Sequence, residues 1–316
     1  MKLTELQQYL IPAVALLHQP KSYIPFSLPS LNIITGGGIP VGMMTDLVGA
    51  QGTGKTSLSL DAIAQAQKCD HTTFYVDQER TFDPAYAQSL GVDLNRLTII
   101  RAGAMEETLT AIEWVFRQHE RAFVVLDSVT WLIPSSASDD NPSDIYETEQ
   151  RIGEHAKKLG LFCKRLTPIL ALRNNTLLFI NQYRANISTL SRVDKKPAGS
   201  FVYHHALSLR LELVTLKKGD DADEVQVTVT KNRTAPARRS ATVKLVHGRG
   251  FDAGADVLQH AIRLGLIEKR GSWYVSPRTG EKVQGEIVAI TTFCTGDLVQ
   301  DVMTLMREEG NNDAMG

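Results

Sequence analysis

The chain has 316 residues, of which 43% are hydrophobic and 22% are charged, and its formal net charge is −1. This composition is that of an ordinary globular protein with enough apolar material for a core. The nearly neutral charge excludes a polycation, so binding to nucleic acid would require basic groups gathered on one surface.

The three cysteines, Cys69, Cys163 and Cys294, lie far apart, and no pair has the spacing of metal ligands. Such a sparse, odd set is typical of a reducing compartment. The start of the chain lacks the features of a signal peptide, and no apolar run is long enough to cross a bilayer. We therefore expect a cytoplasmic protein with no membrane partner.

Residues 1–30 are expected to form a helix followed by a linker. Thr4–Leu17 has the spacing of a short amphipathic helix, which Pro12 breaks or kinks. His18–Ser30 contains several prolines and serines, which is typical of a linker.

Residues 31–250 are expected to form an α/β core with a central, mostly parallel sheet. Four apolar runs rich in β-forming residues alternate with helical patterns, which favours a sheet covered on both faces. The runs are Met43–Val48, Thr72–Val76, Phe123–Leu126 and Thr176–Ile180. Polar or glycine residues end each run, and the carboxyl ends of parallel strands share one edge of a sheet, where ligands bind.

The remaining elements extend this core. Ala206–Val214 and Val225–Thr230 alternate apolar and polar residues, which predicts antiparallel strands in the same sheet. Residues 251–316 are expected to form a small α/β domain. Its predicted elements are a helix over Ala255–Leu266, a hairpin over Ser272–Val283 and a last helix over Gly296–Glu308.

A complete phosphate-loop motif, GAQGTGKT, occupies residues 49–56. Its glycines allow backbone N–H groups to turn towards phosphate oxygens, and a helical pattern follows it. In such a loop Lys55 reaches the β and γ phosphates and the Thr56 hydroxyl binds Mg²⁺. The motif therefore predicts a site for ATP with Mg²⁺. We assign to it Gly49, Ala50, Gln51, Gly52, Thr53, Gly54, Lys55, Thr56 and Ser57.

Three polar residues that follow the other runs complete the expected site. Asp127 would hold Mg²⁺ through water, and Glu79 would orient and deprotonate the attacking water. Gln182 would hydrogen-bond the γ-phosphate and sense its loss after hydrolysis. Capping of a turn or helix is the ordinary structural alternative for Asp127 and Glu79.

Residues 183–200 form a long basic segment with little periodicity. Loops of this length are usually functional or disordered. Because this one adjoins a γ-phosphate contact, it predicts nucleotide-controlled binding of a polyanion, with a solvated surface loop as the alternative. Its cations are Arg184, Arg192, Lys195 and Lys196.

Two further sets of cations point to phosphate. Lys158 and Arg165 share one face of the helix expected over Glu149–Leu172, although a charged face of this kind is usually only solvated. Lys231 and Arg233 continue the apolar stripe of the strand that begins at Val225. They are well placed to reach phosphate in this subunit or in a neighbour.

Taken together, these motifs resemble those of RecA-type recombinases over about residues 26–285. Residues 77–93 resemble the family's segment with the catalytic glutamate and the adenine site. Residues 179–184 resemble its γ-phosphate sensor, and residues 231–233 resemble its intersubunit Lys-Asn-Lys. Residues 266–274 resemble the start of its small C-terminal domain.

The resemblance implies roles for individual residues. Glu79 would be the catalytic base, and Asp83 and Tyr86 would hydrogen-bond and stack on adenine. Lys231 and Arg233 would reach the ATP of the neighbouring subunit. Ser128 and Gly248 are assigned to the same ATP site, and Lys158, Arg165 and Arg184 to the DNA backbone.

The resemblance also implies an activity. A helical filament would form on single-stranded DNA, with residues 1–30 docking between subunits, and would exchange strands with homologous duplex in recombination and repair. Hydrolysis of ATP would turn the filament over. Repressor or mediator partners are not identified by the sequence.

The chain departs from the family pattern after residue 199. His204 and His205 stand where a Lys-Phe pair is expected, in a segment that couples ATP to DNA. This leaves the coupling, and a pH sensitivity, open. The departures suggest a divergent member, such as one encoded by a phage or plasmid. The alternatives are a regulatory paralogue with weak ATPase activity and a hexameric motor such as a helicase. The complete catalytic set disfavours the first, and the C-terminal domain with Lys231 and Arg233 disfavours the second.

Overall fold

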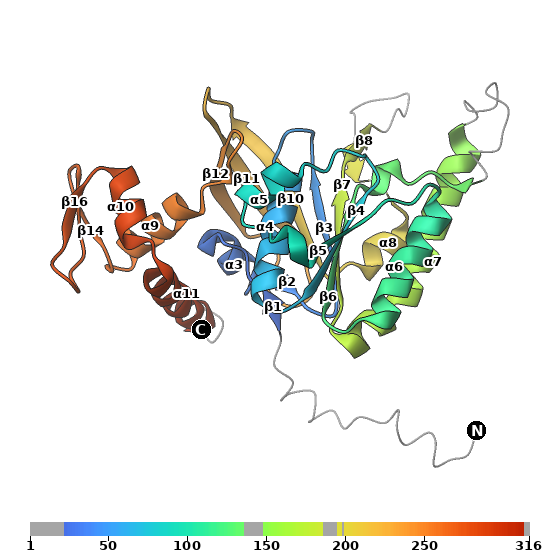
Figure 1. Cartoon of the computed structure of the whole chain (residues 1–316). Helices are drawn as coiled ribbons and strands as arrows, with labels where there is room; N and C mark the ends of the chain where they lie inside the picture. The colour runs from blue at the N-terminus through green and yellow to red at the C-terminus, as the bar shows by residue number, and fades with distance from the viewer. Residues whose placement is uncertain (1–21, 136–147, 186–194, 198, 313–316) are drawn as a thin grey trace, which may run out of the picture.

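The computed structural model describes residues 22–135, 148–185, 195–197 and 199–312, and within them a nine-stranded sheet forms the core (Figure 1). The strands are β3 (Met44–Gly49), β4 (Thr72–Asp77), β5 (Leu97–Ile100), β6 (Ala122–Asp127), β7 (Thr176–Asn181), β10 (Leu209–Lys217), β11 (Ala222–Asn232), β12 (Ser240–Val246) and β13 (Gly250–Phe251). Their order across the sheet is β13-β12-β11-β10-β3-β7-β6-β4-β5.

The strands from β10 to β5 in this order run parallel, and β11, β12 and β13 continue the sheet antiparallel. Every residue of β3, β6 and β7 is buried, so their sequences read as apolar runs rather than as alternating patterns. The prediction of an α/β fold with a mostly parallel central sheet is confirmed.

Helices cover both faces of the sheet. α4 (Lys55–Lys68) packs on one face, and α6 (Met105–Gln118), α7 (Thr148–Arg173) and α8 (Phe201–Ala206) pack on the other (Figure 1). α5 (Pro84–Ser89) and two short 3₁₀ helices, η2 (Leu94–Arg96) and η3 (Val129–Trp131), lie in the connections between strands.

The sequence of α6 explains its place in the fold. Its buried residues include Met105, Leu109, Ile112 and Phe116, which recur every three or four positions and form one apolar stripe. At its start the Glu107 carboxylate accepts hydrogen bonds from two backbone N–H groups just before the helix. The opposite, polar face of α6 is left to meet charged groups.

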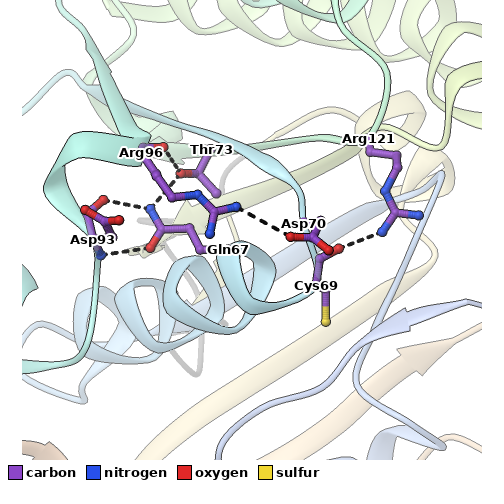
Figure 2. A network of polar contacts seen from close by, with 7 residues as sticks. All are labelled: Gln67, Cys69, Asp70, Thr73, Asp93, Arg96 and Arg121. Atoms are coloured by element: carbon purple, nitrogen blue, oxygen red, sulfur yellow. Dashed lines mark hydrogen bonds and ion pairs between the residues drawn. The ribbon is translucent and has the colours of Figure 1, made fainter.

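A polar network fixes the C-terminal end of α4 (Figure 2). The buried amide of Gln67 donates to the Thr73 hydroxyl at 3.0 Å and to the Asp93 carbonyl at 2.9 Å, and it accepts from the Asp93 N–H at 2.9 Å. Arg121 donates to the Cys69 carbonyl at 2.6 Å. These bonds join α4 to β4 and η2 at the end of the helix that lies away from the phosphate loop.

Residues 22–40 belong to the packed structure. They form β1 (Tyr23–Ile24), α3 (Pro29–Thr35) and β2 (Ile39–Pro40), and Ile24 and Leu28 are fully buried. The prediction of a linker is therefore wrong for residues 22–30, because apolar side chains between the prolines enter the core. The helix predicted over Thr4–Leu17 lies outside the described residues.

The C-terminal elements gather around a core of their own, beside one edge of the sheet (Figure 1). Asp256 accepts hydrogen bonds from the backbone and the hydroxyl of Ser30, at 2.9 and 2.5 Å, and so joins this unit to α3. The predicted helix, hairpin and last helix are present, and β14 and α10 are additional. The elements are α9 (Ala253–Arg263), β14 (Glu268–Arg270), β15 (Trp273–Val275), β16 (Lys282–Gln284), α10 (Glu286–Phe293) and α11 (Gly296–Asn312).

Candidate nucleotide site

The phosphate loop leaves β3 at Gly49 and enters α4 at Lys55. Gly52 and Gly54 have φ angles of 78° and 86°, in the left-handed region that favours glycine. A Cβ atom on Gly54 would also lie 2.8 Å from the ring of Phe251. Glycine is therefore favoured at both positions by the backbone conformation, and at Gly54 also by the close packing of Phe251.

Lys55 is held at the first turn of α4 with its ammonium group over the loop. Its Nζ donates to the Ala50 carbonyl at 2.7 Å, and the residue is only 7% exposed. Burial lowers the pKa of Lys55, and the charges of Asp127 and Glu79 oppose this shift. A phosphate group beside Lys55 would supply the negative charge that favours the ammonium form.

A cavity of about 440 Å³ opens above the loop, at the carboxyl edge of the sheet. Polar groups from four strand ends line it, as the sequence predicted. The predicted residues that line it are Gln51, Gly52, Gly54, Lys55, Thr56, Ser57, Glu79, Tyr86, Asp127, Gln182 and Gly248. Gly49, Ala50, Thr53, Asp83 and Ser128, which were predicted too, do not line it.

Asp127 and Thr56 form an oxygen-rich pair inside this cavity. The Thr56 hydroxyl lies 3.3 Å from the Asp127 carboxylate, and the Tyr75 hydroxyl donates to the same carboxylate at 2.5 Å. Burial raises the pKa of Asp127 to about 6, against the hydrogen bond from Tyr75. A hard divalent cation prefers oxygen ligands such as a hydroxyl and a carboxylate, so these residues fit Mg²⁺.

Glu79 reaches the cavity from the segment after β4. Its Oε1 accepts from the Ser128 hydroxyl at 2.6 Å, and that hydroxyl lies 2.9 Å from the Thr130 hydroxyl. Ser128 therefore acts on the site by orienting Glu79. The neighbouring Asp77 has a different partner, because Arg101 binds its carboxylate at 2.8 Å.

Tyr86 closes another side of the cavity. Its hydroxyl lies 2.7 Å from the hydroxyl of Ser57, the third residue of α4. Asp83 caps α5, where its carboxylate accepts from the backbone N–H groups of Ala85 and Tyr86. The structure thus gives Asp83 a capping role, and its predicted contact with adenine stays a prediction.

The end of β12 and the turn that follows it supply lining residues that sequence reasoning missed. Leu245, Val246 and His247 face the cavity beside Gly248, whose φ angle is 71°. The run Ser240–Val246 was not predicted as a strand, although it alternates polar and apolar residues and buries Val243 and Leu245. The glycines at 248 and 250 were the available signal of a turn after it.

Gln182 follows β7 and lines the cavity, and its backbone N–H donates to the Asn181 side chain at 2.8 Å. Beyond it, β8 (Tyr183–Ala185) and β9 (Lys195–Pro197) pair antiparallel. The expectation of a structureless loop over residues 183–200 is wrong at both ends, because the two ends pair with each other. Arg192 lies outside the described residues, and so do the side chains of Arg184, Lys195 and Lys196.

Lys231 and Arg233 do not line this cavity. Both lie where β11 ends, and both donate to backbone carbonyls at the end of α8. The two cations predicted on α7 are also engaged. Lys158 pairs with Glu106 and with Glu154, the latter at 2.5 Å. Arg165 pairs with Glu113 of α6 at 2.8 Å.

A parallel sheet with a glycine-rich loop, a buried lysine and a hydroxyl–carboxylate pair at its carboxyl edge defines an α/β protein of the phosphate-loop class. In the described part of the chain, no helix has both the length and the apolar character that a bilayer crossing needs.

Comparisons with known proteins identify the family. A sequence model of the RecA N-terminal domain matches residues 22–252. Protein RecA of Fusobacterium nucleatum is 34% identical over 257 residues, which cover 79% of this chain and 67% of the relative. Protein RecA of Thermus thermophilus is 34% identical over 264 residues, 81% and 76% of the two chains. Protein RecA of Thermus aquaticus is 33% identical over 258 residues, 79% and 74%. The chain belongs to the RecA family of recombinases, as its motifs predicted.

Proposed function

We propose that this protein is an ATP-dependent DNA recombinase, which assembles as a filament on single-stranded DNA and exchanges strands with homologous duplex. The observation that carries the proposal is the convergence of Lys55, Glu79, Asp127 and Gln182 on one cavity in a RecA-family chain. Intact hydrolytic groups distinguish it from a regulatory paralogue that has lost them.

The roles of the residues follow from their positions. The backbone N–H groups of the loop and the Lys55 ammonium bind the phosphates and stabilise the charge that develops on the transferred group. Thr56 and Asp127 would hold Mg²⁺, which neutralises phosphate charge when it is bound. Glu79, oriented by Ser128, accepts the proton of the attacking water.

Gln182 connects this chemistry to DNA. Its amide can bond the γ-phosphate and lose that bond after hydrolysis, and the β8–β9 hairpin with its cations follows directly. Lys158 and Arg165 present further positive charge on α7. Both are paired with carboxylates in the free chain, so a DNA phosphate would have to displace the carboxylate from each of them.

Lys231 and Arg233 lie outside the cavity of their own chain, which supports a role at the ATP of a neighbouring subunit. Such a head-to-tail arrangement produces a ring when it closes and a helical filament when it does not. The C-terminal unit with these cations favours the filament, and the hexameric motor is the second candidate.

Two experiments test the proposal. Strand exchange with ATP, single-stranded DNA and homologous duplex should yield joint molecules, and with non-homologous duplex it should not. Negative-stain microscopy with single-stranded DNA and a non-hydrolysable ATP analogue should show filaments. Closed rings without strand exchange would favour the hexameric motor over the recombinase. Weak ATP hydrolysis that DNA does not stimulate would favour the regulatory paralogue.

A further inference from the structure

The strand register places three charged residues in one row on the face of the sheet that α8 covers. Asp46 of β3 lies opposite Arg210 of β10, and Arg210 lies opposite Lys231 of β11. Three residues after Asp46, the same strand reaches Gly49, where the phosphate loop begins. The row therefore joins the strand that carries the loop to the strand that carries Lys231 and Arg233.

Arg210 contacts two partners at once. Its Nε donates to the Asp46 carboxylate at 3.0 Å, and its second guanidinium nitrogen lies 2.6 Å from Nδ1 of His204. The side chains of Arg210 and Asp46 are only 15% and 0% exposed. A guanidinium fork can make both bonds in a fixed geometry, whereas a lysine ammonium on its flexible stem cannot.

Nδ1 of His204 must carry no proton to accept this hydrogen bond from Arg210. Burial lowers the pKa of His204 to about 4, and the positive charges of Arg210 and Lys231 add to the effect. The imidazole is therefore uncharged near neutral pH, and α8 is tied to the sheet by a bond between a cation and a neutral acceptor.

The end of α8 in turn holds the two cations. Lys231 donates to the carbonyls of His204 and His205 at 2.6 and 3.2 Å, and Arg233 donates to the carbonyl of His205. A helix leaves its last carbonyls without internal partners, and positive groups are favoured there. Wherever α8 moves, the partners of Lys231 and Arg233 move with it.

We propose that Arg210 and His204 are positioning residues that set the orientation of Lys231 and Arg233 towards the next subunit. The inference rests on the proposed function, in which those two cations act on a neighbour's ATP. Arg210 anchors α8 to the strand of the phosphate loop, and α8 fixes the cations.

The test compares two variants of one residue. His204→Leu removes the acceptor of the Arg210 bond, whereas His204→Gln keeps an acceptor oxygen. In DNA-stimulated ATP hydrolysis, His204→Leu should lower kcat by about tenfold or more, because the cations stabilise the transition state of the neighbour's site. Its KM for ATP should change by less than about twofold, since its own phosphate loop is intact. His204→Gln should restore most of kcat.

A mixing experiment separates a positioning role from a general loss of structure. The Glu79→Gln variant keeps correctly placed cations but has an inactive ATP site. The His204→Leu variant keeps an intact ATP site but has misplaced cations. In an equal mixture, about a quarter of the interfaces pair a working loop with working cations, since each interface joins unlike surfaces of two subunits. The mixture should therefore reach about a quarter of wild-type activity, several times more than either variant reaches alone.

The Lys231→Ala variant, mixed with Glu79→Gln, identifies which idea fails. If this mixture hydrolyses ATP no faster than either variant alone, the cations do not act between subunits, and that part of the proposed function is wrong. Two results would overturn the positioning role, provided that the Lys231→Ala mixture regains activity. One is a full kcat in the His204→Leu variant alone, and the other is no gain of activity when His204→Leu is mixed with Glu79→Gln. If His204→Leu melts at a markedly lower temperature, Arg210→Lys replaces it in both assays, with the same loss of kcat and the same complementation expected.

Discussion

Replacing Glu113 by glutamine is expected to strengthen binding to single-stranded DNA. In the free chain the Glu113 carboxylate of α6 accepts from Arg165 of α7 at 2.8 Å, and also from Arg117 at 2.8 Å. A DNA phosphate must compete with this carboxylate for Arg165. Glutamine removes the negative charge but keeps the size and an acceptor oxygen, so the packing of α6 on α7 is preserved.

The magnitude follows from the exposure of the pair. The side chain of Arg165 is 60% exposed, so its bond to Glu113 is screened by water. Double-mutant measurements on exposed pairs give about 0.2–1 kcal/mol. Because 1.4 kcal/mol corresponds to a tenfold change, the dissociation constant for DNA should fall by roughly 1.4- to 5-fold. Arg165 still neutralises the same phosphate, so the dependence of affinity on salt should keep its slope.

Fluorescence anisotropy of a labelled oligonucleotide, titrated at several salt concentrations with a fixed ATP analogue, measures both quantities. Glu120→Gln is the matched control, since it removes the same charge from a looser pair with Arg173, 3.8 Å apart. Arg165→Gln should weaken binding and reduce the salt slope by about 0.7. Equal gains in Glu113→Gln and Glu120→Gln would show a general charge effect, and weaker binding by Glu113→Gln would refute the competition.

Further changes test the nucleotide site and the stability of the fold. Lys55→Ala should abolish ATP hydrolysis because it removes the cation that faces the transferred group; phosphate release at the wild-type rate would exclude this site. Gln67→Met should lower the free energy of unfolding by about 1–3 kcal/mol, because it removes the buried amide that bonds the Thr73 hydroxyl and the backbone of Asp93. Urea denaturation measures this loss, and a change under about 0.5 kcal/mol would mean that the network in Figure 2 stabilises little. Burial lowers the pKa of His71 to about 4, whereas an unfolded histidine titrates near 6.5. The unfolded chain therefore binds this proton first, so stability is full above about pH 6.5 and falls, by at most about 1.4 kcal/mol per pH unit, as the pH drops towards 4. Thermal unfolding between pH 7 and 5 should depend less on pH in His71→Phe than in the wild type, and equal slopes would contradict the assignment.

The candidate nucleotide site and the strands that build it could be predicted from the sequence. The phosphate loop is one contiguous motif, and unrelated sequences seldom combine its glycine spacing with a lysine at the start of a helix. Parallel strands buried on both faces read as mostly apolar runs, so β3, β4, β6 and β7 could be found without knowing their neighbours. Their carboxyl ends must share an edge, and this placed Glu79, Asp127 and Gln182 beside the loop.

Two strands without a long apolar run were missed, and one buried segment was misread. β5 is partly exposed at the edge of the sheet, and β12 buries only Val243 and Leu245, so neither gave a clear apolar run. Residues 22–30 looked like a linker because of their prolines, although Ile24 and Leu28 are buried. Burial here depends on which distant surface the segment meets, and local composition does not specify that.

Which charged side chains meet could not be predicted from the sequence and is seen only in the folded chain. Arg165 finds Glu113, 52 residues away, because α6 and α7 pack side by side on the sheet. Asp46, Arg210 and Lys231 form a row because strand order and register place β3 beside β10 and β11, which lie far from it in the chain. Periodicity reports which face of an element is buried, but not which element lies next to it, so ion pairs and relays of this kind are properties of the assembled fold alone.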